Sequence, residues 1–258
     1  MLGLVVLFVE ICSHLVLNPT VRGAKVGENR LDIQRNQPLK MGGSLVGGKS
    51  LNMRPIKILI DYSNMEKANN ISADLQLLIK NIVMPEARKV ITSILKIKQP
   101  RPITLNYEYC GYSDVLFPKS SVGKTFNADL LILVTSRFAP KGNSAAWAVR
   151  CDSEGNIRPT RGMINFNGAS MVKSLDKVNE YIGLAIHEIL HILGFSDQIK
   201  DFYKNTENAL FSRTSNGVTV DYVRTPRLLK YARHYFGCDS LKGLPLEKYH
   251  EGFAPQSH

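Results

Sequence analysis

Apolar residues along this chain alternate between strand-like runs and helical spacing. Between residues 72 and 97 they recur every three or four positions, which predicts a helix. Short, mostly apolar runs on either side predict strands at 56–61, 103–108, 130–135, 146–150 and 162–167. This order of elements is typical of an α+β fold, in which helices cover a sheet.

A second helix is predicted after the last of these strands, and it carries the most informative residues of the chain. Its apolar positions are nearly continuous, and Gly194 follows where such a helix would end. Within it, the stretch His187-Glu188-Ile189-Leu190-His191 interrupts the apolar run with two imidazoles and a carboxylate. We therefore predict a buried helix that ends at a chemical site.

The spacing of the two histidines suits one metal ion. Residues four positions apart lie on the same face of a helix, so His187 and His191 can bind one zinc ion together. Glu188 then lies beside a zinc-bound water, whose pKa the metal lowers to about 7, and can accept its proton. The motif predicts a zinc-dependent metalloprotease. A bare motif of this kind can also be a core helix whose histidines only form hydrogen bonds.

A catalytic zinc site needs a third protein ligand, and spacing alone does not identify it. His234, His250 and His258 are candidates. Three residues beyond Gly194, where the short-spaced metzincin pattern has its third histidine, this chain has Asp197. Either a carboxylate serves as ligand or a histidine far downstream does.

The chain resembles the leishmanolysin-type (M8) metalloproteases, which carry HExxHxxGF and then a long insertion before the third zinc histidine. The match begins with HEILHILGFS at residues 187–196 and covers roughly residues 54–258. Further similar segments occur in the family's order: RPIKILIDYS (54–63), ADLLILVTSR (128–137), AAWAVRCDSEGNIRP (145–159), GMINFN (162–167) and ARHYFGCDSLKGLPLE (232–247).

The resemblance implies a zincin or metzincin-like α+β fold, with a twisted mixed sheet and an insertion that returns the third histidine. The family's Gly-Ser-His tripeptide corresponds to Gln256-Ser257-His258, so His258 is the implied third ligand beside His187 and His191, with Glu188 as general base. His234 lies in a segment whose family histidine does not bind zinc, and we interpret it and His250 as surface or packing residues. The segment 162–167 is expected near the edge strand that binds extended substrates in zincins.

The chain stops after His258, whereas the family continues into a methionine-containing turn and a Cys-rich domain. Every Met precedes the predicted active-site helix. We therefore expect a truncated product and uncertain activity. The first hypothesis is a metalloendopeptidase that hydrolyses proteins or peptides. The alternative is a catalytically silent zincin that acts as a binding or cell-adhesion module, although the retained Glu188 argues against it.

The cysteines and the N-terminus indicate an oxidising compartment. The resemblance implies a disulfide between Cys110 and Cys151, and it leaves Cys238 without its family partner. Asn70 begins an N-glycosylation sequon. We predict a signal peptide at 1–23, a flexible linker or pro-segment remnant at 24–53, a catalytic domain at 54–200, and at 201–258 the insertion with the start of the C-terminal part. A secreted or cell-surface protein follows from these features.

Composition adds one further hypothesis and excludes little. The formal net charge is +11, and 44% of the residues are hydrophobic, enough for a sizeable core. Lys and Arg are spread along the sequence without interleaved aromatics, which favours an ordinary solvated basic surface over nucleic-acid binding. A basic surface-binding protein with a coincidental HExxH is the third hypothesis, which the family-like segments make improbable.

Overall fold

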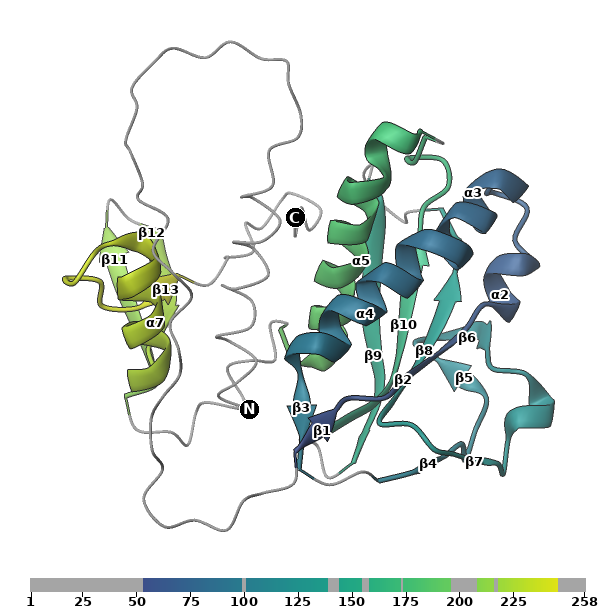
Figure 1. Ribbon diagram of the computed structural model, residues 1–258, viewed down its shortest axis with the longest axis horizontal. Coiled ribbons are helices and arrows are strands. Elements are labelled where there is room, and N and C mark those ends of the chain that lie inside the picture. The colour runs from purple at the N-terminus through teal and green to yellow at the C-terminus, as the bar shows by residue number, and fades with distance from the viewer. Residues whose placement is uncertain are drawn as a thin grey trace.

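The computed structural model describes residues 53–98, 101–138, 144–154, 158–172, 174–195, 208–215 and 218–245. They form a larger unit up to residue 195 and a smaller one from residue 208 onward, on the right and left of Figure 1. The predicted α+β fold with a mixed sheet is confirmed. The predicted signal peptide and all but residue 53 of the linker lie outside the described residues, as do His250 and His258.

A four-stranded sheet is the centre of the larger unit. Its order is β2 (Ile58–Asp61), β8 (Leu130–Thr135), β10 (Arg158–Phe166) and β9 (Ala146–Glu154). The first three strands are parallel, and β9 pairs antiparallel with β10 at the edge. Every residue of β8 is buried, as expected for a parallel strand covered on both faces.

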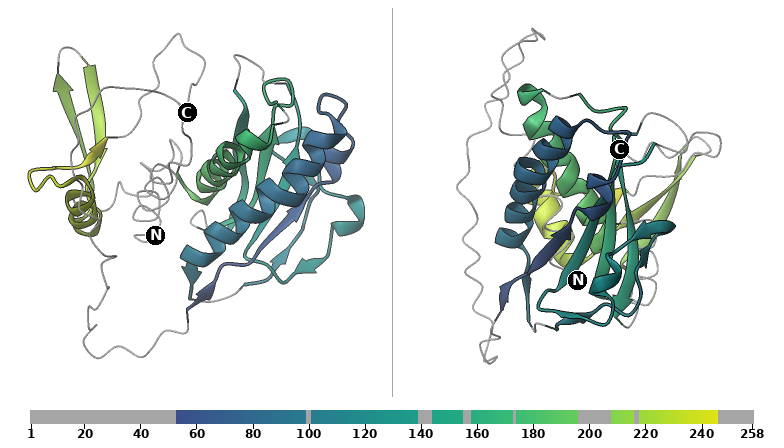
Figure 2. Two further views of the ribbon diagram at one scale, coloured as in Figure 1. Left: turned by 45° about the horizontal axis from the view of Figure 1, so that its top comes forward. Right: turned by 90° about the vertical axis from the view of Figure 1, so that its right-hand side faces the viewer.

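One face of this sheet is covered by helices (Figure 2). A continuous helical run consists of α3 (Ala73–Leu78), the π-helical turn η1 (Ile79–Val83) and α4 (Met84–Ile94). The Ser72 hydroxyl accepts a hydrogen bond from the Leu75 amide and caps its start. The helix α5 (Val178–Leu193) packs against α4 and against β9 and β10, so the predicted motif helix lies directly on the sheet.

The opposite face of the sheet carries short strands and turns. They are β4 (Ile103–Thr104), β5 (Tyr109–Cys110), β6 (Tyr112–Leu116), the 3-10 turn η2 (Lys119–Ser121) and β7 (Thr125–Phe126). A second apolar cluster, which includes Leu105, Val115 and Phe117, packs there against Leu131, Leu133 and Met163 of the sheet. The remaining short elements are β1 (Arg54–Pro55), α2 (Ser63–Glu66), β3 (Lys96–Ile97) and η3 (Leu175–Lys177).

The smaller unit is a three-stranded sheet with one helix. Its strands are β11 (Leu210–Ser215), β12 (Val218–Val223) and β13 (Leu244–Pro245), and its helix is α7 (Pro226–Phe236). Ala209, Val223 and Leu228 form its core. Phe195, which follows the motif helix, packs against this core and also against the core of the larger unit.

The strand predicted at 162–167 lies in the second half of β10, which pairs with the edge strand β9, so it lies near the sheet edge as expected. Two other sequence predictions differ from the structure. The helix predicted to residue 97 ends at Ile94, and Lys96–Ile97 pairs with β1. The strand predicted at 103–108 is only Ile103–Thr104.

Within the described ranges, no helix combines the length and apolar character that crossing a membrane requires.

Candidate functional site

The helix α5 brings three of the predicted site residues together near its C-terminal end. Glu188 is fully buried, whereas His187 and His191 are half-buried. Because the site lies in the last turns of the helix, the partial negative charge of the helix C-terminus favours a bound cation there.

The two imidazoles face one another through their Nε2 atoms. Those atoms are 2.9 Å apart, and the ring planes are 86° apart with centroids at 4.5 Å. Two ligand nitrogens on a tetrahedral zinc ion, each about 2.0–2.1 Å from the metal, are separated by about 3.3 Å. The pair is therefore within a few tenths of an ångström of the separation that a shared zinc ion requires.

A glycine turn after the helix orients one of these rings. Gly194 has φ 125°, a backbone conformation that residues with a side chain rarely adopt. Its amide donates to the carbonyls of His191 and Leu190. The turn brings the carbonyl oxygen of Phe195 against Nδ1 of His191, so that Nδ1–H donates to it. With the proton on Nδ1, the lone pair of Nε2 is available to a metal. The contact through Phe195 was not predicted, because a backbone carbonyl has no sequence signal.

Glu188 is a buried carboxyl group without a hydrogen-bond partner. Both of its carboxylate oxygens are buried and have no hydrogen-bond partner. Burial disfavours the charged form and raises the pKa of Glu188 to about 8. Burying such a group costs folding free energy unless a partner is supplied, which marks this position as a functional-site candidate.

Close packing at a glycine seats the helix on the sheet. A Cβ atom on Gly162 of β10 would lie 2.5 Å from Cγ2 of Ile192, which follows His191 on α5. The Ile192 side chain fills the space that a side chain at position 162 would need. Gly162 therefore sets how closely the part of α5 that carries His187 and His191 approaches the sheet, a role that sequence pattern alone did not indicate.

A third ligand for the predicted zinc ion is not found among the described residues. No group of three or more His, Cys, Asp or Glu side chains there is arranged to hold a metal. His258 and Asp197 both lie outside the described ranges. His234 is exposed on α7, in agreement with its interpretation as a surface residue.

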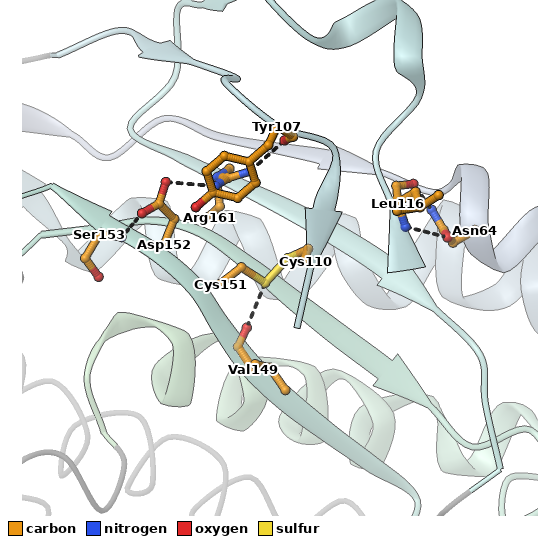
Figure 3. Close-up of a disulfide and its surroundings, with 9 residues drawn as sticks. All are labelled: Asn64, Tyr107, Cys110, Leu116, Val149, Cys151, Asp152, Ser153 and Arg161. Atoms are coloured by element: carbon orange, nitrogen blue, oxygen red, sulfur yellow. Dashed lines mark hydrogen bonds and ion pairs between the residues drawn. A yellow bond between two sulfur atoms is a disulfide. The ribbon is translucent and has the colours of Figure 1, made fainter. Parts of the chain in front are cut away.

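On the face of the sheet opposite the helices, a disulfide and a buried arginine join the short strands to β9 and β10 (Figure 3). Cys110 of β5 is bonded to Cys151 of β9, the pair that the resemblance implied. Nearby, Arg161 is only 1% exposed; it donates to the Tyr107 carbonyl at 3.0 Å and to Asp152 at 2.8 Å. Its guanidinium also lies 3.9 Å from the centre of the Tyr107 ring. These contacts anchor the segment before β5.

Two other predicted residues have clear surroundings. The Nδ2 atom of Asn70, where a glycan would be attached, is buried without a hydrogen-bond partner, and Ser72 of the same sequon caps α3. Glycosylation would require this region to rearrange, so it stays a prediction that the packing does not favour. Cys238 is a free, half-buried thiol whose sulfur lies 3.4 Å from Oγ of Ser240.

Comparison with known proteins decides the family. The leishmanolysin (peptidase M8) family model matches residues 62–258, which include the motif helix, the smaller unit and the larger unit after β2. The chain belongs to the leishmanolysin family. This is a family of metallopeptidases, so the resemblance stated from the sequence is confirmed.

Among leishmanolysin relatives, a homolog from Crithidia fasciculata is 28% identical over 192 residues, which are 72% of this chain and 28% of the relative. Leishmanolysin of Leishmania major is 27% identical over 176 residues, 66% of this chain and 28% of that protein. A leishmanolysin-like peptidase of Drosophila melanogaster is 26% identical over 161 residues, 47% of this chain and 24% of the relative. The matched part of the chain thus spans about a quarter of the length of these relatives, from 24% to 28%.

Proposed function

We propose that this leishmanolysin-family chain is a zinc-dependent metalloendopeptidase that hydrolyses peptide bonds in proteins or peptides. His187, His191 and His258 hold one zinc ion, and Glu188 is the general base. The observation that carries the proposal is a pair of converging imidazole nitrogens beside a buried, uncompensated carboxyl group. The silent binding module has no specific observation in its favour.

The donor set fits zinc. Two neutral imidazoles and a third nitrogen or oxygen ligand are a common catalytic combination, and they leave one position for water. The hydrogen bond from His191 Nδ1 to the Phe195 carbonyl prepares Nε2 for metal coordination. When bound, zinc supplies a Lewis acid that lowers the pKa of water and polarises the substrate carbonyl.

Glu188 holds and moves the proton. Its buried carboxylate accepts the proton of the attacking water and then delivers it to the departing amine nitrogen. A raised pKa suits both transfers, because a carboxyl group with a pKa of about 8 is a stronger base than an exposed glutamate. A neighbouring cation lowers this pKa and so favours the charged form that accepts the proton.

Secretion or attachment to a cell surface is part of the same proposal. The disulfide supports it, since such bonds persist in oxidising compartments.

The test is hydrolysis of a quenched fluorescent peptide library by the zinc-loaded chain, with bound zinc measured in the same sample. Glu188→Gln keeps the shape of the side chain but removes its basicity, and we expect activity to fall by about 10²–10⁴-fold with zinc retained. The matched control is Glu180→Gln, which changes an exposed carboxylate in the first turn of the same helix. Zinc-loaded, folded wild-type chain without hydrolysis would favour the silent module; a chain that binds no zinc would refute the proposal.

A further inference from the structure

The side chain of Phe195 lies where the motif helix and the two units meet. It packs against the core between the helices and the central sheet. It also packs against the core of the smaller unit, which consists of Ala209, Val223 and Leu228. Among the described residues, Phe195 alone packs against both of these cores. The ring therefore ties the end of α5 to the smaller unit.

The backbone of the same residue contacts the candidate site. The amide of Phe195 donates to the Leu190 carbonyl at 3.0 Å, one turn back along α5, and Gly194 makes the turn between them. The carbonyl oxygen of Phe195 accepts the hydrogen bond from Nδ1 of His191. One residue thus combines a ring held in two cores with a carbonyl oxygen that orients a proposed zinc ligand.

Holding the ring restricts where this carbonyl oxygen can lie. The amide bond to Leu190 fixes one end of Phe195 but leaves rotation about its own backbone bonds. Protein interiors are close-packed, so a ring enclosed by apolar side chains from two cores has few alternative positions. With both the amide and the ring held, the backbone between them has little freedom. Removing the ring would leave only the amide bond to hold it.

The orientation of His191 matters for metal binding. A histidine ligand needs a free lone pair on the nitrogen that faces the metal, and the partner of its other nitrogen fixes both the tautomer and the ring orientation. The smaller unit lies in the chain between His191 and His258, the proposed third ligand. The segment that leads to the third ligand thus also contacts the residue that orients the second.

We propose that Phe195 is a positioning residue, through which the smaller unit holds His191 in the tautomer and orientation that bind zinc. The inference rests on the proposed function, because it treats His191 as a zinc ligand. It adds that the smaller unit must be packed against Phe195 for the site to be preorganised. The competing account is that the turn at Gly194 is sufficient and that the ring contributes only packing.

Two measurements separate these accounts, and the first needs no metal. Long-range ¹H–¹⁵N NMR of the zinc-free chain at about pH 8, where imidazoles are mostly neutral, shows which nitrogen of His191 carries the proton. We expect Nδ1–H in the wild-type chain and a mixture of tautomers in Phe195→Ala. Zinc affinity, measured by competition with a chelator, should fall about 10-fold in Phe195→Ala. Phe195→Leu keeps an apolar side chain in both cores and should restore both properties.

A matched control and a second variant test the route through the smaller unit. Leu193→Ala is the control: Leu193 is half-buried like Phe195 but packs against the larger core alone. It should lose stability with the His191 tautomer and zinc affinity unchanged. Leu228→Ala opens the smaller core and should reproduce the effects of Phe195→Ala, even where the smaller unit unfolds. Fluorescence of Trp147, the sole tryptophan, shows that the larger unit stays folded, because it lies on β9.

The outcomes distinguish this inference from the proposed function. An unchanged tautomer and unchanged zinc affinity in Phe195→Ala would overturn the inference and leave the proposed function intact. Equal losses in Leu193→Ala would overturn it too, because any lost packing near the end of α5 would then act alike. A wild-type chain that binds no zinc would refute both.

Discussion

The two faces of the central sheet differ in whether a buried ionisable side chain has partners. Opposite the helices, Arg161 is 1% exposed and has a carboxylate, a carbonyl and an aromatic ring as partners. On the helical face, Glu188 is 0% exposed and neither of its oxygens has a partner. The same sheet thus supports one satisfied charge and one unsatisfied acid.

The difference separates a structural role from a functional one. A paired, hydrogen-bonded charge fixes the arrangement of the segments that it joins, as Arg161 does for the Tyr107 segment. An unpaired buried acid lowers stability and persists where chemistry requires it. We therefore expect a bound cation to raise the free energy of unfolding and to allow activity through the residues on the helical face. Substitutions on the opposite face should leave cation binding unchanged.

Zinc binding should produce the largest change. At free zinc about 1,000 times above the dissociation constant, the free energy of unfolding should rise by about 4 kcal/mol. His258→Ala should remove most of this gain because it deletes the proposed third ligand, whereas His234→Ala should retain it. Thermal unfolding with and without zinc measures both. Equal behaviour of the two variants would contradict the assignment of His258.

Acidity provides the next test of the comparison. Because burial raises the pKa of Glu188 to about 8 from 4.5, the folded state binds more protons than the unfolded state between those values. The stability of the zinc-free chain should therefore fall by roughly 3 kcal/mol as the pH rises from 5 to 8, at about 1.4 kcal/mol per pKa unit.

Urea unfolding at several pH values measures this dependence. Glu188→Gln should abolish the slope, and zinc should reduce it in the wild-type chain. A wild-type profile parallel to that of Glu188→Gln would mean that the carboxyl is not buried in solution.

On the opposite face, removing a satisfied charge should cost stability without affecting zinc. Arg161→Met keeps much of the side-chain volume but leaves Asp152 and the Tyr107 carbonyl without their donor. We expect a loss of about 3 kcal/mol by denaturant titration and unchanged zinc affinity. Arg101→Met, which breaks an exposed pair with Glu154, is the control and should cost far less. A large change in zinc affinity for Arg161→Met would remove the distinction between the faces.

The smallest expected effect concerns how closely α5 packs on the sheet. Gly162→Ala places a methyl group against Ile192 and should destabilise the chain by about 2 kcal/mol. The penalty should shrink in an Ile192→Ala background, because the two residues contact each other. Additive losses in the double variant would show that the close packing is not what the substitution disturbs.

Much of the fold could be predicted locally. The run 130–135 coincides with β8, and Gly194 ends α5 as expected, because each signal depends only on residues close in sequence. Strand pairing was less predictable. Residues 162–166 form part of an inner strand, and only the presence of β8 on one side and β9 on the other decides that.

The site divides in the same way. Helical periodicity by itself determined that His187 and His191 share one face and that Glu188 adjoins them, since four residues make about one helical turn. The tertiary structure decided that Glu188 is buried without a partner, that the Phe195 carbonyl orients His191, and that Gly162 lets α5 lie close to the sheet. The burial of Glu188 and the contact of Gly162 with Ile192 depend on atoms brought together from different elements, and the Phe195 contact depends on the turn at Gly194, so the electrostatics of the site cannot be read from the motif.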